Sequence, residues 1–237
     1  MLRFYAMGIR DALNNVRDKI NNSAVKAGRN PEDIKLIAVS KTVELPKIVA
    51  AVKAGASILG ENRIQEARNK ITELRAENPY LKPEWHLIGN LQKNKVKIAV
   101  QLFDLIHSLD SVELAEALNN YSDKAGKKQR VLVQVKLSDE ITKHGVPERD
   151  VIQLVQKVTE MKHLQIDGLM TIPPFFDDIE KTRPYFRKLR ELRDKLSSEG
   201  LDLSELSMGM SGDFKVAIEE GATMVRVGTA IFGERNY

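Results

Sequence analysis

The sequence predicts an α/β protein whose fold is a single (β/α)8 TIM-type barrel with an extra N-terminal helix. Eight short apolar segments alternate with stretches in which apolar residues recur every three or four positions, as expected of strands that alternate with helices. A chain of 237 residues has about the length that this barrel needs. The expected strands are 35–39, 57–59, 85–88, 105–107, 131–135, 166–170, 206–208 and 224–227.

The N-terminal segment 1–28 has the pattern of an amphipathic helix that ends at Gly28. Its apolar residues lie three or four positions apart and include Ile9, Leu13, Val16 and Ile20. We expect this helix to cover the barrel. Because no low-complexity linker divides the sequence, we expect residues 1–237 to form one domain.

A later helix is expected to begin before Leu114, where Asp110 and Glu113 are three residues apart as in a capping box. The competing architecture is an open doubly wound sheet, which would place a glycine-rich fingerprint after the first strand. The turn at 40–44 reads Ser-Lys-Thr-Val-Glu and contains no glycine. The absence of a glycine-rich fingerprint from this turn favours the barrel.

The composition is that of an ordinary globular protein, with 42% hydrophobic and 30% charged residues. The net charge of +4 is spread along the chain and aromatic residues are only 5%, so we expect no nucleic-acid partner. The absence of cysteine excludes disulfides, thiolate metal sites and cysteine nucleophiles, and we expect no metal site. No segment resembles a membrane span or a signal peptide, so we expect a cytoplasmic protein with no membrane partner.

Lys41 ends the apolar run 34–41, which the sequence predicts to be a buried strand. Because barrel enzymes place their chemistry at the carboxyl ends of strands, we expect Lys41 at the barrel mouth. A partly desolvated amine loses its proton easily and can condense with an aldehyde as a Schiff base. The alternative is a strand-end lysine that only reaches water.

Hydroxyl and glycine residues follow the last two expected strands, as Ser211-Gly212 and Gly228-Thr229. Phosphate sites of barrels are commonly built by these two loops, whose backbone N–H groups can approach an anion closely at glycine. We therefore expect a phosphate site here. The alternative is that the glycines only shape tight turns.

A phosphate site across the mouth from a Schiff-base lysine predicts a phosphorylated aldehyde, and pyridoxal 5′-phosphate (PLP) is the common one. Arg226 would then face the pyridine nitrogen of PLP as a hydrogen-bond donor, because a guanidinium keeps its proton at working pH. The ring nitrogen would stay unprotonated, and the cofactor would be a weak electron sink. Taken alone, an arginine such as Arg226 is more often a structural ion-pair partner.

Six strings in the sequence together resemble one known family. They are A-V-S-K (38–41), G-E-N-x-x-Q-E (60–66), W-H-x-I-G-x-L-Q-x-N-K (85–95), I-H-S-x-D (106–110), M-G-M-S-x-D (208–213) and R-x-G-T-x-I-F-G (226–233). In this order they look like the pyridoxal phosphate homeostasis protein family. The resemblance implies an alanine-racemase-like barrel that binds PLP and has no firmly established catalytic activity. It also implies a role in vitamin B6 balance inside the cell.

The resemblance also implies residue roles. Lys41 would form the Schiff base, Arg226 would face the pyridine nitrogen, and the phosphate would be held by Ser211, Gly228 and Thr229. Asn62 would contact the ring oxygen or pack on the ring.

His86 and Met210 would line the pocket, although a histidine on the third strand is as often a satisfied core group. His107 and Asp110 are expected to support the loop or cap a helix rather than touch the cofactor. Glu61 and Gln65 are expected to orient their loop.

Three functions compete. A PLP carrier or regulator without turnover would exchange the cofactor with apo forms of PLP-dependent enzymes, and its open mouth suits a monomer. A racemase-like enzyme needs two acid–base groups on opposite faces of the substrate carbon. The resembled racemases take the second from a C-terminal β-domain, whereas this sequence ends at Tyr237 soon after the eighth strand, so we expect no robust turnover. A Schiff-base aldolase would leave Arg226 without a role.

Overall fold

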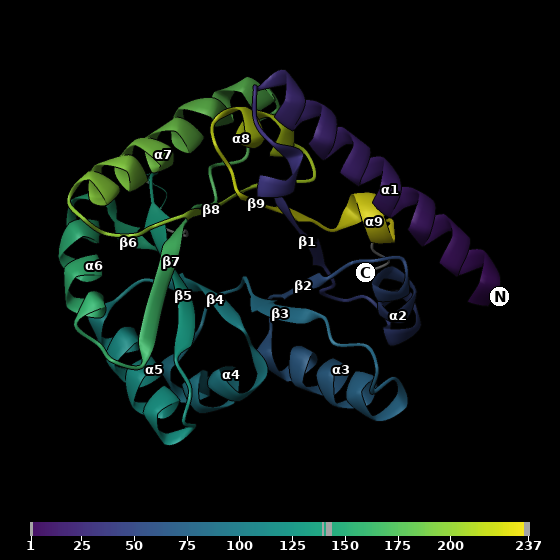
Figure 1. Ribbon diagram of the computed structural model, residues 1–237, viewed down its shortest axis with the longest axis horizontal. Coiled ribbons are helices and arrows are strands. Elements are labelled where there is room, and N and C mark those ends of the chain that lie inside the picture. Colours follow the sequence, from purple (N-terminus) through teal and green to yellow (C-terminus); the bar gives the residue numbers. More distant parts are fainter. Residues whose placement is uncertain (1, 139, 141–143, 235–237) are drawn as a thin grey trace.

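The structure is a computed structural model and describes residues 2–138, 140 and 144–234. It confirms the expected barrel. Eight parallel strands form a closed sheet in the order β4-β3-β2-β1-β9-β8-β7-β5, and pairing of β4 with β5 closes it (Figure 1). The strands are β1 Lys35–Val39, β2 Ile58–Glu61, β3 Glu84–Leu87, β4 Leu105–Leu109, β5 Gln129–Lys136, β7 Leu164–Met170, β8 Glu205–Met210 and β9 Met224–Val227.

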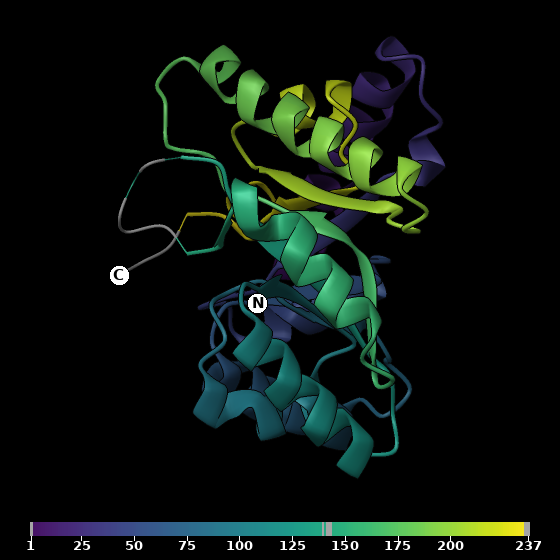
Figure 2. The same cartoon turned by 90° about the vertical axis from the view of Figure 1, so that its left-hand side faces the viewer.

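Helices follow the strands and form the outer layer (Figures 1 and 2). They are α2 Leu45–Lys53, α3 Ile64–Glu77, α4 Val96–Leu102, α5 Val112–Lys124, α6 Val151–Thr159, α7 Arg183–Ser198, α8 Phe214–Glu219 and α9 Thr229–Phe232. Short 3-10 turns lie at Pro31–Asp33, Lys93–Lys95, Glu148–Asp150 and Ile179–Thr182. Both α2 and α7 carry a proline in the first turn, where its missing N–H costs no intrahelical bond.

The N-terminal helix α1, Leu2–Lys26, packs against α2, α8 and α9 (Figure 1). It therefore fills the position in the outer ring between α8 and α2, next to β9 and β1. The helix after β9 has only four residues, so it is too short to cover this side of the barrel by itself. Arg29, which follows α1, donates to the carbonyl oxygens of Ile218 in α8 and of Ala222 after α8, at 2.8 and 2.7 Å.

Two buried layers hold the fold together. The larger lies between the strands and the helices and includes the apolar face of α1. The smaller fills the barrel interior and consists of Ile37, Ile58, Leu105, Leu132, Met170 and Met224. The side chains of each strand alternate between these two layers. Inward-facing residues that come before or after the interior cluster along a strand therefore lie toward one of the two mouths of the barrel.

Two details differ from the sequence predictions. Ser111, rather than Asp110, caps α5, because its Oγ accepts the backbone N–H of Leu114 at 3.2 Å. A two-residue strand, β6 Val146–Pro147, pairs with the carboxyl end of β5 and was not expected. A segment this short has no periodicity to detect.

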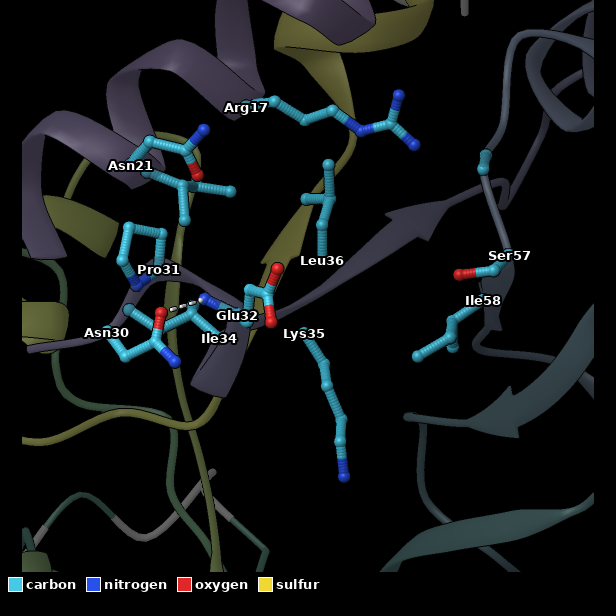
Figure 3. Close-up of a pocket in the computed structure, with 12 residues that line it drawn as sticks. Arg17, Asn21, Asn30, Pro31, Glu32, Ile34, Lys35, Leu36, Ser57 and Ile58 are labelled. Carbon is cyan, nitrogen blue, oxygen red and sulfur yellow. Dashed lines mark hydrogen bonds between the residues drawn. The ribbon is translucent and has the colours of Figure 1, made fainter.

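The amino-terminal mouth of the barrel is closed by ion pairs. Arg130 lies 2.6 Å from Asp167 and 3.7 Å from Glu84, and Lys35 pairs with Glu205. A cavity of about 540 Å³ lies at this end, between α1 and the starts of β1 and β2 (Figure 3). Lys35 begins β1 whereas Lys41 follows its end, so this cavity is separate from the expected site.

Within the part of the chain that the structure describes, no helix combines the length and the apolar character that a membrane crossing requires.

Candidate functional site

The turn after β1 carries Lys41. Ser40 is fully buried, Lys41 is half-buried, and Thr42 adopts a left-handed backbone with φ 62°. A β-branched residue rarely adopts this conformation, which costs on the order of 1–3 kcal/mol and persists only where the surroundings enforce it.

A clamp from α3 enforces the turn. Lys70 Nζ donates to the carbonyl oxygen of Ser40 at 2.6 Å, and Glu66 accepts the backbone N–H of Thr42. The two peptide groups that flank Lys41 are therefore both bonded to side chains of the same helix. Lys70 also contacts Glu66 at 2.6 Å and Glu61 at 2.9 Å, and Ser40 Oγ donates to Glu61 at 2.6 Å.

The charges of this clamp are strongly coupled. Burial raises the pKa of Glu61, and the neighbouring Lys70 and the Ser40 hydroxyl oppose that rise. Burial alone would also raise the pKa of Glu66, but hydrogen bonds from Lys70 and Thr42 outweigh it and hold that pKa below its ordinary value. Lys70 thus favours the ionised forms of both carboxyl groups beneath the Lys41 turn.

The loop after β8 lies against the loop after β9. The Ser211 Oγ accepts the backbone N–H of Gly228 at 3.3 Å, and the Met210 N–H donates to Asp213 at 2.6 Å. Gly209 has φ 90°, and a Cβ there would lie 2.6 Å from the Ala217 side chain. This turn therefore requires glycine.

Lys41, Gly228 and Thr229 line one cleft of about 160 Å³, together with Thr42 and Lys47. The expected placement of the phosphate loops across the mouth from Lys41 was wrong. Barrel closure pairs β9 directly with β1, so the lysine and the last loop are neighbours.

Arg226 lies inside the barrel below this cleft and is 4% exposed. Its Nη1 donates to Ser207 Oγ at 2.6 Å and its Nη2 donates to the carbonyl oxygen of Thr171 at 2.9 Å. Burial lowers the pKa of Arg226 to about 10, and the charge of Asp213 opposes this effect. The guanidinium is therefore a cation at neutral pH and is held by hydrogen bonds rather than by a close ion pair.

The remaining expected residues lie at different depths in the barrel. Asn62 is half-buried and lines two cavities of about 270 and 390 Å³. Met210 is 39% exposed and borders an apolar cavity of about 300 Å³ with Gly212. His86 is 1% exposed, and its ring nitrogens already contact Glu84 and His107.

His107 is fully buried, with its other ring nitrogen 3.0 Å from Ser207 Oγ. Burial raises the pKa of Asp110.

Several residues of this site were not singled out from the sequence. They are Lys70, which donates to Ser40 in the turn, Thr42, whose backbone N–H donates to Glu66, and Ser207, which accepts from Arg226. Of these, Lys70 had a detectable signal, because it lies four residues after Glu66 and so predicts an ion pair on α3.

Comparison with known proteins places the chain in a family. Residues 12–236 match the family described as alanine racemase, N-terminal domain. The protein from Aquifex aeolicus named pyridoxal phosphate homeostasis protein is 44% identical over 232 residues, which cover 98% of this chain and the whole of the relative. The chain belongs to the pyridoxal phosphate homeostasis protein family. Proteins of the same name from Vibrio alginolyticus and Escherichia coli K12 are 39% and 38% identical, over 97% and 94% of this chain and 98% and 94% of their own lengths.

Solved structures agree with this family. PipY of Synechococcus elongatus, whose structure was determined with PLP bound, is 37% identical with a TM-score of 0.84, covering 95% of this chain and all of that one. An alanine racemase of Clostridium difficile is 19% identical with a TM-score of 0.73, covering 97% of this chain but 57% of that one. The racemase likeness shows the shared barrel fold.

Proposed function

We propose that this protein binds PLP as a Schiff base on Lys41 and serves vitamin B6 homeostasis by buffering the cofactor or delivering it to apo enzymes, without robust turnover of its own. The observation that carries the proposal is the cleft in which Lys41 and Gly228-Thr229 lie side by side. PLP carries its aldehyde and its phosphate arm on neighbouring ring carbons. A lysine next to an anion site is therefore the arrangement that PLP requires.

The attachment is a condensation. The neutral ε-amine of Lys41 attacks the aldehyde carbon, a C=N bond forms, and the aldehyde oxygen leaves as water. The clamp from α3 fixes both peptide groups around Lys41, so the amine is presented to the cleft from a turn with little freedom. Less conformational entropy is then lost when the bond forms.

The phosphate is assigned to the two adjacent loops. The hydroxyls of Ser211 and Thr229 and the backbone at Gly228 supply neutral donors. The Gly228 N–H donates to Ser211 Oγ, and a phosphate oxygen would take the place of that acceptor. Asn62 is assigned to the ring oxygen and Met210 to the rim of the pocket.

Arg226 is assigned to the pyridine nitrogen. When bound, PLP supplies electron withdrawal from a carbon attached to its imine, and this withdrawal is strongest when the ring nitrogen carries a proton. A guanidinium can only donate to that nitrogen and so leaves it unprotonated. Weak electron withdrawal suits a protein that holds the cofactor rather than one that uses it.

Two findings on relatives support the proposal. The relatives at 37–44% identity are named for homeostasis rather than for a reaction, and a structure of PipY has PLP bound. Their similarity extends over nearly the whole of this chain.

A transfer experiment tests the proposed function. The PLP-loaded protein, freed of excess PLP by gel filtration, is mixed with an apo PLP enzyme in the presence of an enzyme that destroys free PLP. We expect the wild type to keep a visible absorbance band through gel filtration and to reactivate the apo enzyme despite the scavenger. Lys41→Ala should do neither, whereas Lys47→Ala, which alters another lysine of the same cleft, should retain the band. A wild type that binds no PLP would refute the proposal.

A further inference from the structure

A continuous row of hydrogen-bonded side chains crosses the barrel interior from the amino-terminal mouth to Arg226. Glu84 Oε2 lies 3.3 Å from His86 Nε2, and His86 Nδ1 lies 3.0 Å from His107 Nε2. His107 Nδ1 lies 3.0 Å from Ser207 Oγ, which in turn lies 2.6 Å from Arg226 Nη1. These residues come from β3, β4, β8 and β9, so only the folded barrel brings them together.

The two ends of the row determine its direction. Arg226 can only donate, so Ser207 Oγ accepts from it and keeps its own proton available to donate to His107 Nδ1. At the other end the carboxylate of Glu84 can only accept, so His86 donates to it through Nε2–H. The bond between the rings then runs from His107 Nε2–H to His86 Nδ1. Every proton therefore points away from Arg226 and toward Glu84.

The electrostatics agree with neutral imidazoles that each carry their proton on Nε2. Burial holds the pKa of His107 well below its ordinary value, and the nearby charges of Arg226 and Arg130 lower it further. Burial also lowers the pKa of His86, although Glu84 opposes this. The hydrogen bond from His86 and the charges of Arg130 and Lys35 lower the pKa of Glu84 against the opposing effect of burial, which keeps its carboxylate ionised.

Arg226 needs such support. A buried cation is costly unless hydrogen bonds and oriented dipoles compensate it, and the partners of its terminal nitrogens are both neutral oxygens. Among the described residues, each terminal nitrogen makes one hydrogen bond, and a guanidinium has a second N–H on each of these nitrogens. The direction in which the guanidinium presents those donors is set by Ser207 and Thr171.

We propose that Glu84, His86, His107 and Ser207 form a directional relay that positions the donors of Arg226 toward the cofactor ring. This rests on the proposed function, in which Arg226 faces the pyridine nitrogen of PLP. His86 and His107 act through Ser207 and are positioning residues. The relay holds the ring nitrogen unprotonated and so contributes to the absence of robust turnover.

The first test uses the ligand-free protein and does not depend on PLP. Nitrogen-15 NMR of the imidazole rings distinguishes a protonated from an unprotonated ring nitrogen, and the chain has only 4 histidines. We expect both His86 and His107 to show Nε2 protonated and Nδ1 unprotonated. A proton on Nδ1 of His107, or a doubly protonated ring at neutral pH, would overturn the relay even if no variant folds.

The second test compares Ser207→Ala with Ser108→Ala. Ser108 is the neighbour of His107 on β4, is fully buried, and has no hydrogen-bond partner for its hydroxyl among the described residues, so it is a matched control. We expect Ser207→Ala to shift the visible band of the PLP-loaded protein and to weaken PLP retention about tenfold, as for loss of one hydrogen bond to a charged group. Ser207→Thr, which keeps the hydroxyl, should restore the wild-type band.

The outcomes separate this inference from the proposed function. A wild type with the visible band, in which Ser207→Ala behaves like Ser108→Ala, would overturn the relay and leave PLP binding intact. A wild type without any band would refute PLP binding, while the NMR measurement would still decide whether the relay exists.

Discussion

Lys70 Nζ lies 2.6 Å from the carbonyl oxygen of Ser40, the residue immediately before Lys41. This contact joins the middle of α3 to the carboxyl end of β1. Together with the bond from Glu66 to Thr42, it explains how a threonine can be held at φ 62° next to the lysine that we assign to the cofactor. The outer helix layer thus determines the geometry of the mouth.

Replacing Lys70 with methionine should destabilise the fold by about 3–5 kcal/mol, because it leaves the buried carboxylate of Glu61 without its counter-charge. Urea unfolding measures the change. Arg68→Met on the same helix is the control, since Arg68 is exposed, and it should stay within about 0.5 kcal/mol of the wild type. A Lys70→Met variant as stable as Arg68→Met would show that the clamp contributes nothing.

The stability of Lys70→Met should also fall as the pH rises. Without Lys70, burial is the dominant influence on Glu61, and the pKa of this carboxyl in the folded protein rises further above its value in the unfolded chain. A carboxyl with a raised folded-state pKa contributes stability below the unfolded pKa, and that contribution is lost as the pH rises through the folded pKa. Unfolding free energies from mildly acidic to neutral pH should therefore decline more steeply for Lys70→Met than for Lys70→Met/Glu61→Gln, in which residue 61 cannot ionise. An equal decline with pH in the two variants would contradict the assignment of this pH dependence to Glu61.

Removing both hydroxyls assigned to the phosphate should discriminate between two forms of the vitamin. Ser211→Ala combined with Thr229→Val is expected to weaken PLP retention by at least about tenfold, since each hydroxyl gives a hydrogen bond to a charged group. Retention of pyridoxal, which has no phosphate, should change little. Equilibrium dialysis with both compounds measures the difference, and an equal loss of both would refute the phosphate site.

Alanine racemisation by the pure PLP-loaded protein should be negligible. A donor-only guanidinium at the ring nitrogen weakens the electron withdrawal that deprotonation of an amino acid needs. Chiral chromatography of alanine after long incubation checks this, with Lys41→Ala to identify activity that depends on the site. Vigorous racemisation that disappears in Lys41→Ala would overturn the non-enzymatic proposal.

The strand pattern was readable from the sequence because buried parallel strands are short apolar runs between helical repeats. The strands at 35–39 and 224–227 agree with β1 and β9 to the residue. The N-terminal helix was equally clear from its spacing. Its position between α8 and α2 was not, because the sequence does not reveal that α9 is too short to cover its own part of the barrel.

The chemistry of the site was less accessible than its location. Lys41 and the hydroxyl–glycine pairs stand at strand ends, where residue type alone is informative. Ser207, His107 and Glu84 lie within strands, and a buried serine or histidine there is indistinguishable from an ordinary core residue until the pairing order of the strands is known. The phosphate loops were placed across the mouth from Lys41, although closure of the predicted barrel already makes the last strand a neighbour of the first. Tyr237, at which the sequence ends, lies outside the described residues.

The attachment point of PLP tests the central claim most directly. Treating the PLP-loaded protein with borohydride reduces the C=N bond and fixes the pyridoxyl group on its lysine, and peptide mass spectrometry then identifies that lysine. We expect the group on Lys41, in near-stoichiometric amount. Modification of Lys47, Lys70 or any other lysine in its place, or no modified peptide at all, would contradict the assignment.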